Sequence, residues 1–149
     1  NYKYMKTTEN PIYQKFELEG VKHISVADAY ELVKNKHAIM IDVRDTFEVQ
    51  NEYVPLENVL YYSMPLITER LNFIDKNQNI IVACPQGVRS TKVAYLLNRN
   101  QYPSVANLDG GFNEWKKQGL PFETNLLIIS NGCGCDYCCN SNDENNKCC

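Results

Sequence analysis

The sequence predicts an α/β fold in which a parallel central sheet of about five strands is flanked by helices. Segments typical of strands and of amphipathic helices alternate along most of the chain. Two strand segments, 38–43 and 79–83, are almost continuously apolar, as expected for parallel strands that are covered on both faces. No tight-turn sequence joins two strand segments into a hairpin, so right-handed crossovers are expected to connect the strands.

The first half of the domain contributes two strands and two helices. A short strand is expected at 21–24, and Ser25 then caps a helix over 26–36, because an acidic residue follows it three positions later. The apolar strand 38–43 comes next and leads into a short helix near 47–51. One face of the first helix is apolar, with Ala29, Tyr30, Leu32 and Val33.

The middle of the chain contributes an aromatic-rich strand around 59–62 and a further helix. Pro65 marks the start of this helix, because proline fits the first helical turn. Three apolar residues at helical spacing predict that it continues as far as Ile74; they are Ile67, Leu71 and Ile74.

The last third of the domain contributes strands at 79–83 and 104–108, each followed by a helix. The first of these helices is expected over 91–100, because its apolar residues fall on one side. The second contains Trp115, which we expect to pack in the core. Glycine and proline at 119–121 end this helix.

Composition indicates one domain with an extension at each end. We expect an N-terminal arm over 1–20, the α/β domain over 21–124, and a flexible cysteine-rich tail over 125–149. The formal net charge of −3 argues against a nucleic acid or an anionic membrane as the main partner. No apolar segment approaches the roughly 20 residues of a membrane-spanning helix.

The sequence begins at Asn1 rather than at a methionine. A tail that is rich in thiols is easiest to keep reduced in the cytoplasm, which is therefore the expected compartment. Export to the periplasm with removal of a signal segment is the alternative, because it would also account for the missing methionine.

The most informative segment follows the strand 79–83 directly. Cys84 begins a tight loop that is expected to surround it with backbone N–H groups, and it faces a helix N-terminus. This arrangement favours the thiolate over the thiol. We therefore expect Cys84 to be a nucleophile, the alternative being a buried cysteine without reactivity. The remaining residues of the expected site loop are Pro85, Gln86, Gly87, Val88, Arg89 and Ser90.

Several polar residues near this loop have two interpretations. Arg89 attracts an anionic substrate, or it braces the loop against a carboxylate such as Asp42 or Glu48. Ser90 is expected to cap the following helix rather than to act in catalysis. We expect Asp42 to be a structural acid at the end of its strand.

Loop length bears on the chemistry. Four residues separate Cys84 from Arg89, whereas cysteine phosphatases place five between the two residue types and so form a wider cradle. The shorter loop suits a single sulfur atom better than a phosphoryl group. The two histidines, His23 and His37, have no partner motif, so we expect solvated or capping roles for both.

Three segments together resemble the rhodanese-like domain family of sulfurtransferases. They are Ile41-Asp42-Val43-Arg44-Asp45 with Glu48, the Cys-x-x-Gly-x-Arg-Ser arrangement from Cys84, and the run from Asn107 through Gly110-Gly111 and Trp115 to Gly119-Leu120-Pro121. The resemblance extends over about 22–123. It implies a rhodanese-like α/β fold in which Cys84 carries sulfane sulfur as a persulfide, with Asp42 and Arg44 in supporting positions.

The same resemblance implies the substrates. A small sulfur donor such as thiosulfate would load Cys84, and a thiol, a cyanide-like acceptor or an acceptor protein would remove the sulfur, with no cofactor required. The chain departs from the family pattern at Glu52 and Tyr53, where members usually carry a Gly-His pair. It also has Pro85 where many members place a basic residue. These departures weaken the case for thiosulfate as the natural donor.

The tail has chemistry of its own. Its Cys-x-Cys and Cys-Cys spacings are tighter than those of zinc knuckles and resemble metallothionein-like clusters, which hold soft ions such as Cu(I) or Zn(II). The tail thus binds a soft metal, accepts sulfur from Cys84, or is an unstructured end. A second functional hypothesis follows, namely an interaction module that handles sulfur or metal without turnover. The cysteines concerned are Cys133, Cys135, Cys138, Cys139, Cys148 and Cys149.

Overall fold

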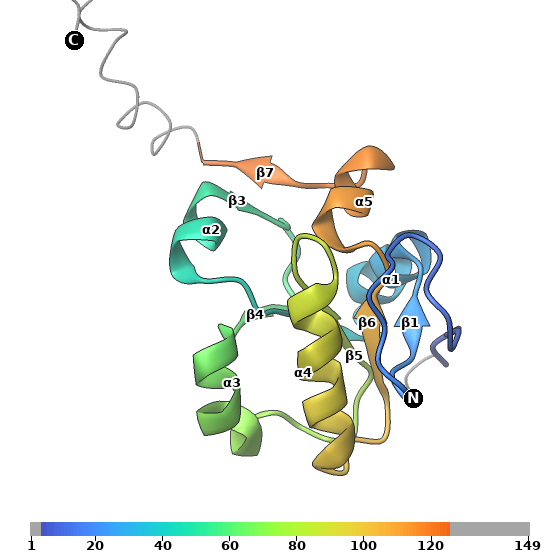
Figure 1. Cartoon of the computed structure of the whole chain (residues 1–149). Helices are drawn as coiled ribbons and strands as arrows, with labels where there is room; N and C mark the ends of the chain where they lie inside the picture. The colour runs from blue at the N-terminus through green and yellow to red at the C-terminus, as the bar shows by residue number, and fades with distance from the viewer. Residues whose placement is uncertain (1–3, 126–149) are drawn as a thin grey trace, which may run out of the picture.

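The computed structural model of the chain describes residues 4–125 and confirms the predicted α/β fold (Figure 1). Its main sheet has five strands, all parallel, in the order β1-β6-β5-β2-β4. The strands are β1 (His23–Ile24), β2 (Ile39–Asp42), β4 (Val59–Tyr61), β5 (Ile80–Ala83) and β6 (Val105–Leu108). The helices are α1 (Val26–Lys34), α2 (Thr46–Asn51), α3 (Met64–Arg70), α4 (Val88–Arg99) and α5 (Gly111–Lys117), with a 3-10 turn at Leu71–Phe73.

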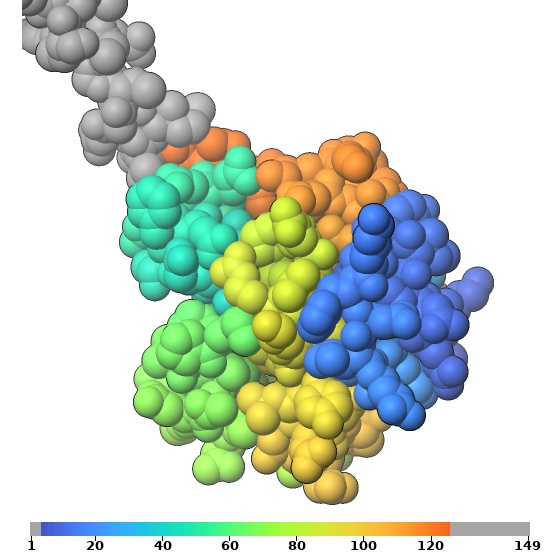
Figure 2. All heavy atoms as spheres, viewed as in Figure 1, coloured from blue at the N-terminus to red at the C-terminus, as the bar shows by residue number. Residues whose placement is uncertain are grey.

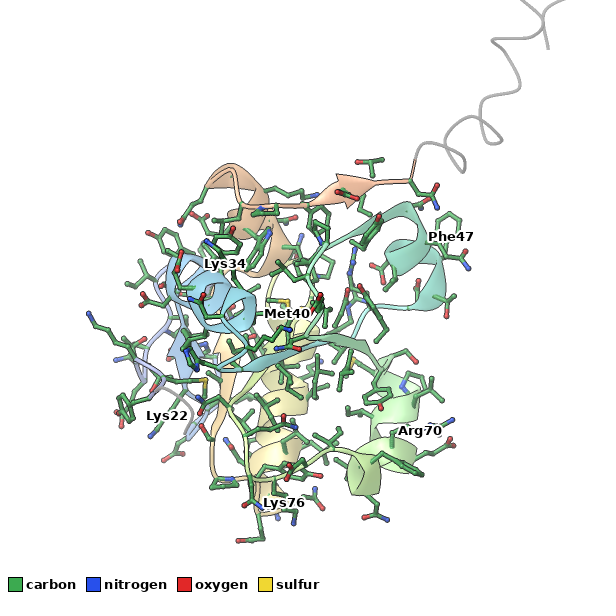
Figure 3. All side chains as sticks on the ribbon, turned by 180° about the vertical axis from the view of Figure 1, so that it is seen from behind. Lys22, Lys34, Met40, Phe47, Arg70 and Lys76 are labelled. Carbon is green, nitrogen blue, oxygen red and sulfur yellow. The ribbon has the colours of Figure 1, made fainter. Side chains whose placement is uncertain are left out.

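The strands are apolar along their length because both faces of the sheet are covered. In β2, Met40 packs into a core with α1 and α5, whereas its neighbour Ile41 packs into a second core with α3 and α4. The same alternation holds in β5, where Ile81 belongs to the first core and Val82 to the second. Figure 3 shows Met40 inside the molecule.

Helix α5 contributes Trp115 to the first core. This side chain is fully buried, meets Tyr30 of α1 edge to face, and donates from Nε1 to the Pro121 carbonyl at 2.8 Å. The expected packing role of Trp115 is confirmed.

The predicted cap of α1 is also present. The Ser25 Oγ accepts from the Asp28 backbone N–H at 3.2 Å.

One structural element was not predicted. β3 (Glu52–Tyr53) and β7 (Glu123–Thr124) form a separate antiparallel ribbon, so the domain is not purely parallel. The Tyr53 hydroxyl donates to the Glu123 carboxylate at 2.8 Å. The two segments are short, polar and far apart in the sequence, and therefore carry no strand periodicity that would have revealed them.

Several helix boundaries also differ from the predictions. The first helix ends at Lys34 rather than at residue 36, and two other differences are larger. The helix after β4 does not continue to Ile74, because α3 ends at Arg70 and gives way to the 3-10 turn. The helix after Cys84 begins at Val88 rather than at residue 91. The earlier start of this helix places Val88, Arg89 and Ser90 in its first turn.

The N-terminal arm lies beside the start of α4, as Figure 2 shows in blue and yellow. Thr8 forms an antiparallel bridge with His23. Farther along the arm, the Asp109 carboxylate accepts from the backbone N–H groups of Ile12 and Tyr13 at 2.8 and 3.0 Å. Within residues 4–125, no helix is both long enough and apolar enough to cross a bilayer.

Candidate active site

Cys84 lies at the carboxyl end of β5, where parallel α/β sheets place their ligands. Only 1% of the residue is exposed. Its Sγ accepts from the backbone N–H groups of Gly87 at 3.1 Å and Ser90 at 3.3 Å, and the Ser90 hydroxyl lies 3.2 Å away. Backbone donors aimed at one atom in a buried site stabilise negative charge on that atom.

The start of α4 explains this arrangement and corrects the expected role of Ser90. The N-cap of α4 is Gly87, whose left-handed φ of 89° turns the chain into the helix. Arg89 and Ser90 consequently lie in the first helical turn, and Ser90 is not the cap. Because glycine has no capping side chain, the sulfur of Cys84 accepts the Ser90 N–H that such a side chain would usually bind.

The outer side of the loop is held by α5. Phe112 N–H donates to the Cys84 carbonyl at 2.9 Å, and Asn113 N–H donates to the Pro85 carbonyl at 3.0 Å. Gly111 permits this contact, because a Cβ built there would lie 2.2 Å from the Cys84 carbonyl oxygen. With these two carbonyls bound on the outside, the loop presents N–H groups to the sulfur.

Arg89 braces the loop. Its guanidinium donates to both carboxylate oxygens of Glu48 at 2.9 Å, which ties α2 to the start of α4. The hydrogen bonds from Arg89 lower the pKa of Glu48 to about 2 and raise that of Arg89. Of the two carboxylates expected as partners, the structure selects Glu48 rather than Asp42.

Asp42 pairs instead with Arg44, and both side chains are almost fully buried. The Arg44 guanidinium donates to Asp42 Oδ2 at 2.8 Å and to the Glu52 carbonyl at 2.8 Å. It also lies over the Phe112 ring, 4.6 Å from the centroid. The pair thus joins the ends of β2 and α2 to α5, in agreement with the structural role expected for Asp42.

A buried polar network extends behind the sulfur. The Ser90 hydroxyl donates to Asn107 Oδ1, and Asn107 Nδ2 contacts His23 Nδ1 at 3.0 Å. His23 is therefore buried, whereas a solvated or capping role was predicted for it, and burial lowers its pKa. Its Nε2 has no hydrogen-bond partner within the described residues. His37 lies just after α1, and its backbone N–H donates to the Leu32 carbonyl at 2.8 Å.

Gln14 of the arm, which the sequence did not single out, connects this network to the loop. Its Oε1 accepts from Asn107 Nδ2 at 2.9 Å and Gly110 N–H at 3.0 Å. Its Nε2 lies 3.3 Å from the Gly87 carbonyl and 3.0 Å from Thr91 Oγ1. Nothing in the arm sequence distinguishes Gln14, whereas Asn107 is polar within an otherwise apolar strand and could have been noticed.

A hollow of about 290 Å³ lies on the Pro85 side of the loop. Its cationic side chains are already paired, Arg44 with Asp42 and Lys116 with Glu52. Its lining residues are Arg44, Glu48, Asn51, Glu52, Pro85, Phe112, Asn113, Lys116 and Phe122. A second hollow opens on the other side of the loop, where Gln86 and Val88 line it together with Lys15, Lys117 and Glu114.

The six tail cysteines lie outside the described residues, so metal binding by them stays a prediction. Within residues 4–125, no cluster of three or more metal-ligating side chains occurs. Cys84 is free of any disulfide.

Comparison with known proteins agrees with this geometry. The family model for the rhodanese-like domain matches residues 25–118. The chain is 36% identical to the thiosulfate sulfurtransferase GlpE of Coxiella burnetii over 95 residues, which span 64% of this chain and 87% of that protein.

Two solved structures share the fold. A rhodanese-like domain protein from Staphylococcus aureus is 31% identical, with a TM-score of 0.56 over 62% of this chain and 89% of that one. The polysulfide-sulfur transferase of Wolinella succinogenes is 26% identical, with a TM-score of 0.60 over 68% of this chain and 77% of that one.

Replacing Gly111 with alanine tests the contact between α5 and the loop. We expect Gly111→Ala to slow alkylation of Cys84 by iodoacetamide about tenfold, because displaced N–H groups no longer stabilise the thiolate. Gly119→Ala is the matched control, since Gly119 also has a positive φ but a Cβ there meets nothing within 4 Å. Equal alkylation rates in the two variants would contradict the interpretation.

The Arg89–Glu48 pair predicts a pH-dependent contribution to stability. Because the pKa of Glu48 is depressed from 4.5 to about 2, the contribution is complete above pH 4.5 and is lost as the pH falls toward 2. Thermal unfolding of Glu48→Gln should therefore show a lower Tm than the natural sequence near neutral pH and converge with it near pH 2. Glu57→Gln removes a far more exposed pair and should change the Tm little at any pH.

Gln14→Ala tests the connection between the arm and the loop. We expect it to lower the free energy of unfolding by about 2 kcal/mol, because Asn107 and Gly110 lose an acceptor. Urea denaturation measures this change, and hydrogen exchange should show faster exchange at the Gly110 amide. Lys15→Ala, at an exposed neighbouring position, is the control and should change neither quantity. An unaltered Gly110 exchange rate in Gln14→Ala would argue against the connection.

Proposed function

This chain belongs to the rhodanese-like domain family, and we propose that it is a sulfurtransferase in which Cys84 carries sulfane sulfur as a persulfide. The observation that carries the proposal is the pair of backbone N–H groups, from Gly87 and Ser90, that converge on Sγ. This arrangement supports an anionic sulfur first as thiolate and then as persulfide. The four-residue span between Cys84 and Arg89 suits one added sulfur atom better than a phosphoryl group.

The proposed reaction has two steps. The Cys84 thiolate attacks the outer sulfur of the donor, the donor's S–S bond breaks, and with thiosulfate the electron pair leaves on sulfite. A nucleophilic acceptor, either a thiolate or cyanide, then attacks the outer sulfur of the persulfide. That bond breaks with its electron pair on Cys84 Sγ, which returns as thiolate. Neither step requires a cofactor.

The charges around the loop bear on the choice of donor. Arg89 and Arg44 are each engaged with a carboxylate, so neither is available as a free cation for a dianion. Lys15 and Lys117 line the hollow on the Gln86 side, which we propose as the entrance for an anionic donor. A small persulfide, which carries a single negative charge, fits these charges at least as well as the dianion thiosulfate does.

The decisive measurement is peptide mapping by mass after brief exposure of the reduced protein to thiosulfate or polysulfide. We expect the mass of one sulfur atom on the Cys84 peptide. Cys84→Ser should lose this mass and lower the rate of sulfur transfer to cyanide at least about a thousandfold, because the nucleophile is removed. The control is Ser104→Ala, which removes a partly buried hydroxyl just before the amino end of β6, the end of the sheet away from Cys84. This variant should keep both the added sulfur mass and the rate of transfer to cyanide.

An unmodified Cys84 in folded, reduced protein, with both donors, would contradict the proposal. Such a result would favour the alternative hypothesis of a module that handles sulfur or metal without turnover.

A further inference from the structure

A chain of buried hydrogen bonds joins the Cys84 sulfur to His23. His23 and Asn107 are register partners in β1 and β6, which lie side by side in the sheet (Figure 1). Their side chains meet at 3.0 Å, and Asn107 Oδ1 accepts from the Ser90 hydroxyl. The Ser90 Oγ in turn lies 3.2 Å from Cys84 Sγ. All four residues are buried, so the direction of each bond decides what the sulfur meets.

Gln14 fixes the direction of the chain, because it contacts backbone groups that cannot exchange roles. Its Oε1 accepts from the Gly110 N–H at 3.0 Å, and its Nε2 donates to the Phe16 carbonyl at 2.7 Å. A backbone N–H only donates and a carbonyl only accepts, so the Gln14 amide cannot be turned over. Its Oε1 therefore faces Asn107 as an acceptor.

The Asn107 amide is oriented in turn. Its Nδ2 donates one hydrogen to Gln14 Oε1 at 2.9 Å and the other to His23 Nδ1 at 3.0 Å, which uses both N–H groups. Only Oδ1 remains for Ser90, and because an amide oxygen cannot donate, the Ser90 hydroxyl is the donor. The hydroxyl proton thus points away from Cys84, and Ser90 Oγ offers the sulfur a lone pair.

His23 holds the other end of the chain as a neutral ring. Since Nδ1 accepts from Asn107, the ring proton is on Nε2, which is buried and has no partner within residues 4–125. An imidazolium would bring two N–H groups face to face at Nδ1. Burial lowers the pKa of His23, in agreement with a neutral ring, and the charged groups near it are Asp109 and Glu17.

We propose that Asn107 is a positioning residue: it keeps the Ser90 hydroxyl proton away from the sulfur of Cys84, and so favours the loaded persulfide over the free thiolate. The part that concerns the persulfide rests on the proposed function. A lone pair beside Sγ accepts from the thiol and opposes negative charge on that atom. In a persulfide the charge lies on the outer sulfur, one bond farther from Ser90. The chain therefore makes the thiolate a poorer leaving group and retains sulfur on Cys84.

The first test measures the direction of the chain in the natural full-length protein. Nitrogen NMR of histidine-labelled protein distinguishes the two ring tautomers, and His37→Gln assigns the signals to the two histidines. We expect His23 to be the Nε2-protonated tautomer at neutral pH. A ring protonated at Nδ1 would reverse the hydrogen bond to Asn107 and overturn the inference.

The second test removes the lone pair and keeps the Ser90 backbone N–H. Ser90→Ala should lower the midpoint of the pH profile of Cys84 alkylation by about 0.5–1 unit, because nothing then opposes charge on Sγ. Peptide mapping by mass follows Cys84 separately from the other cysteines. A midpoint that rises or stays the same would overturn the inference, because Ser90 would then donate to the sulfur or not affect it.

Ser104→Ala is the matched control for this measurement. The Ser104 Oγ also donates to an asparagine side-chain oxygen, Asn79 Oδ1, at 2.7 Å, but at the end of the sheet away from Cys84. The same group and the same kind of bond are lost, so the variant should leave the midpoint unchanged.

Other charged groups near the sulfur do not obscure the midpoint. Arg89 faces Cys84 and is paired with Glu48, whose pKa is about 2. The pKa of His23 is lowered by burial. Neither Glu48 nor His23 therefore changes charge between about pH 7 and 10, the range in which thiols titrate.

The third test separates this inference from the proposed function. After loading with thiosulfate or polysulfide, Ser90→Ala should release its sulfur to cyanide about fivefold faster than the natural sequence, because the thiolate leaves more readily. Equal or slower release would overturn the inference and leave the proposed function intact. A Cys84 that takes up no sulfur in either protein would overturn the proposed function, whereas the tautomer and the alkylation midpoint would still test the direction of the chain.

Discussion

The contact between the start of α5 and the loop after Cys84 determines how the candidate site is built. Two N–H groups of α5 bind the carbonyls of Cys84 and Pro85, and this close approach requires that residue 111 has no side chain. Held by these two hydrogen bonds, the loop keeps the Gly87 and Ser90 N–H groups directed at the Cys84 sulfur. The electrostatic environment of the sulfur therefore originates in a packing contact between two backbones.

Side chains around the loop hold it in place rather than add net charge. Arg89 joins α2 to α4, Arg44 joins β2 to α5, and Gln14 joins the arm to both helices that flank the sulfur. Both arginines are neutralised by carboxylates. The site thus stabilises an anion through oriented dipoles, whose effect falls off quickly with distance and acts mainly on the atom at their focus.

The sequence predicted those parts of the structure that repeat or that depend on neighbouring residues. Strands buried on both faces must be apolar throughout, so the positions of β2 and β5 could be predicted from the sequence. The position of β5 in turn predicted where the Cys84 loop begins. The β3–β7 ribbon, Gln14 and the burial of His23 depend on contacts between distant segments, which leave no local pattern. The predicted capping role of Ser90 is wrong for a different reason. The N-cap of α4 is Gly87, which has no capping side chain, so the Cys84 sulfur accepts the Ser90 N–H in its place.

The capping of α4 by sulfur has a consequence for the whole domain. A cap at a helix N-terminus contributes about 0.5–2 kcal/mol, and a negative charge there interacts favourably with the helix dipole. Because α4 packs against β5, β6 and the second core, a neutral adduct on Cys84 removes support from an element at the centre of the fold. The chemical state of one sulfur atom is thereby linked to the stability of the helix that begins beside it.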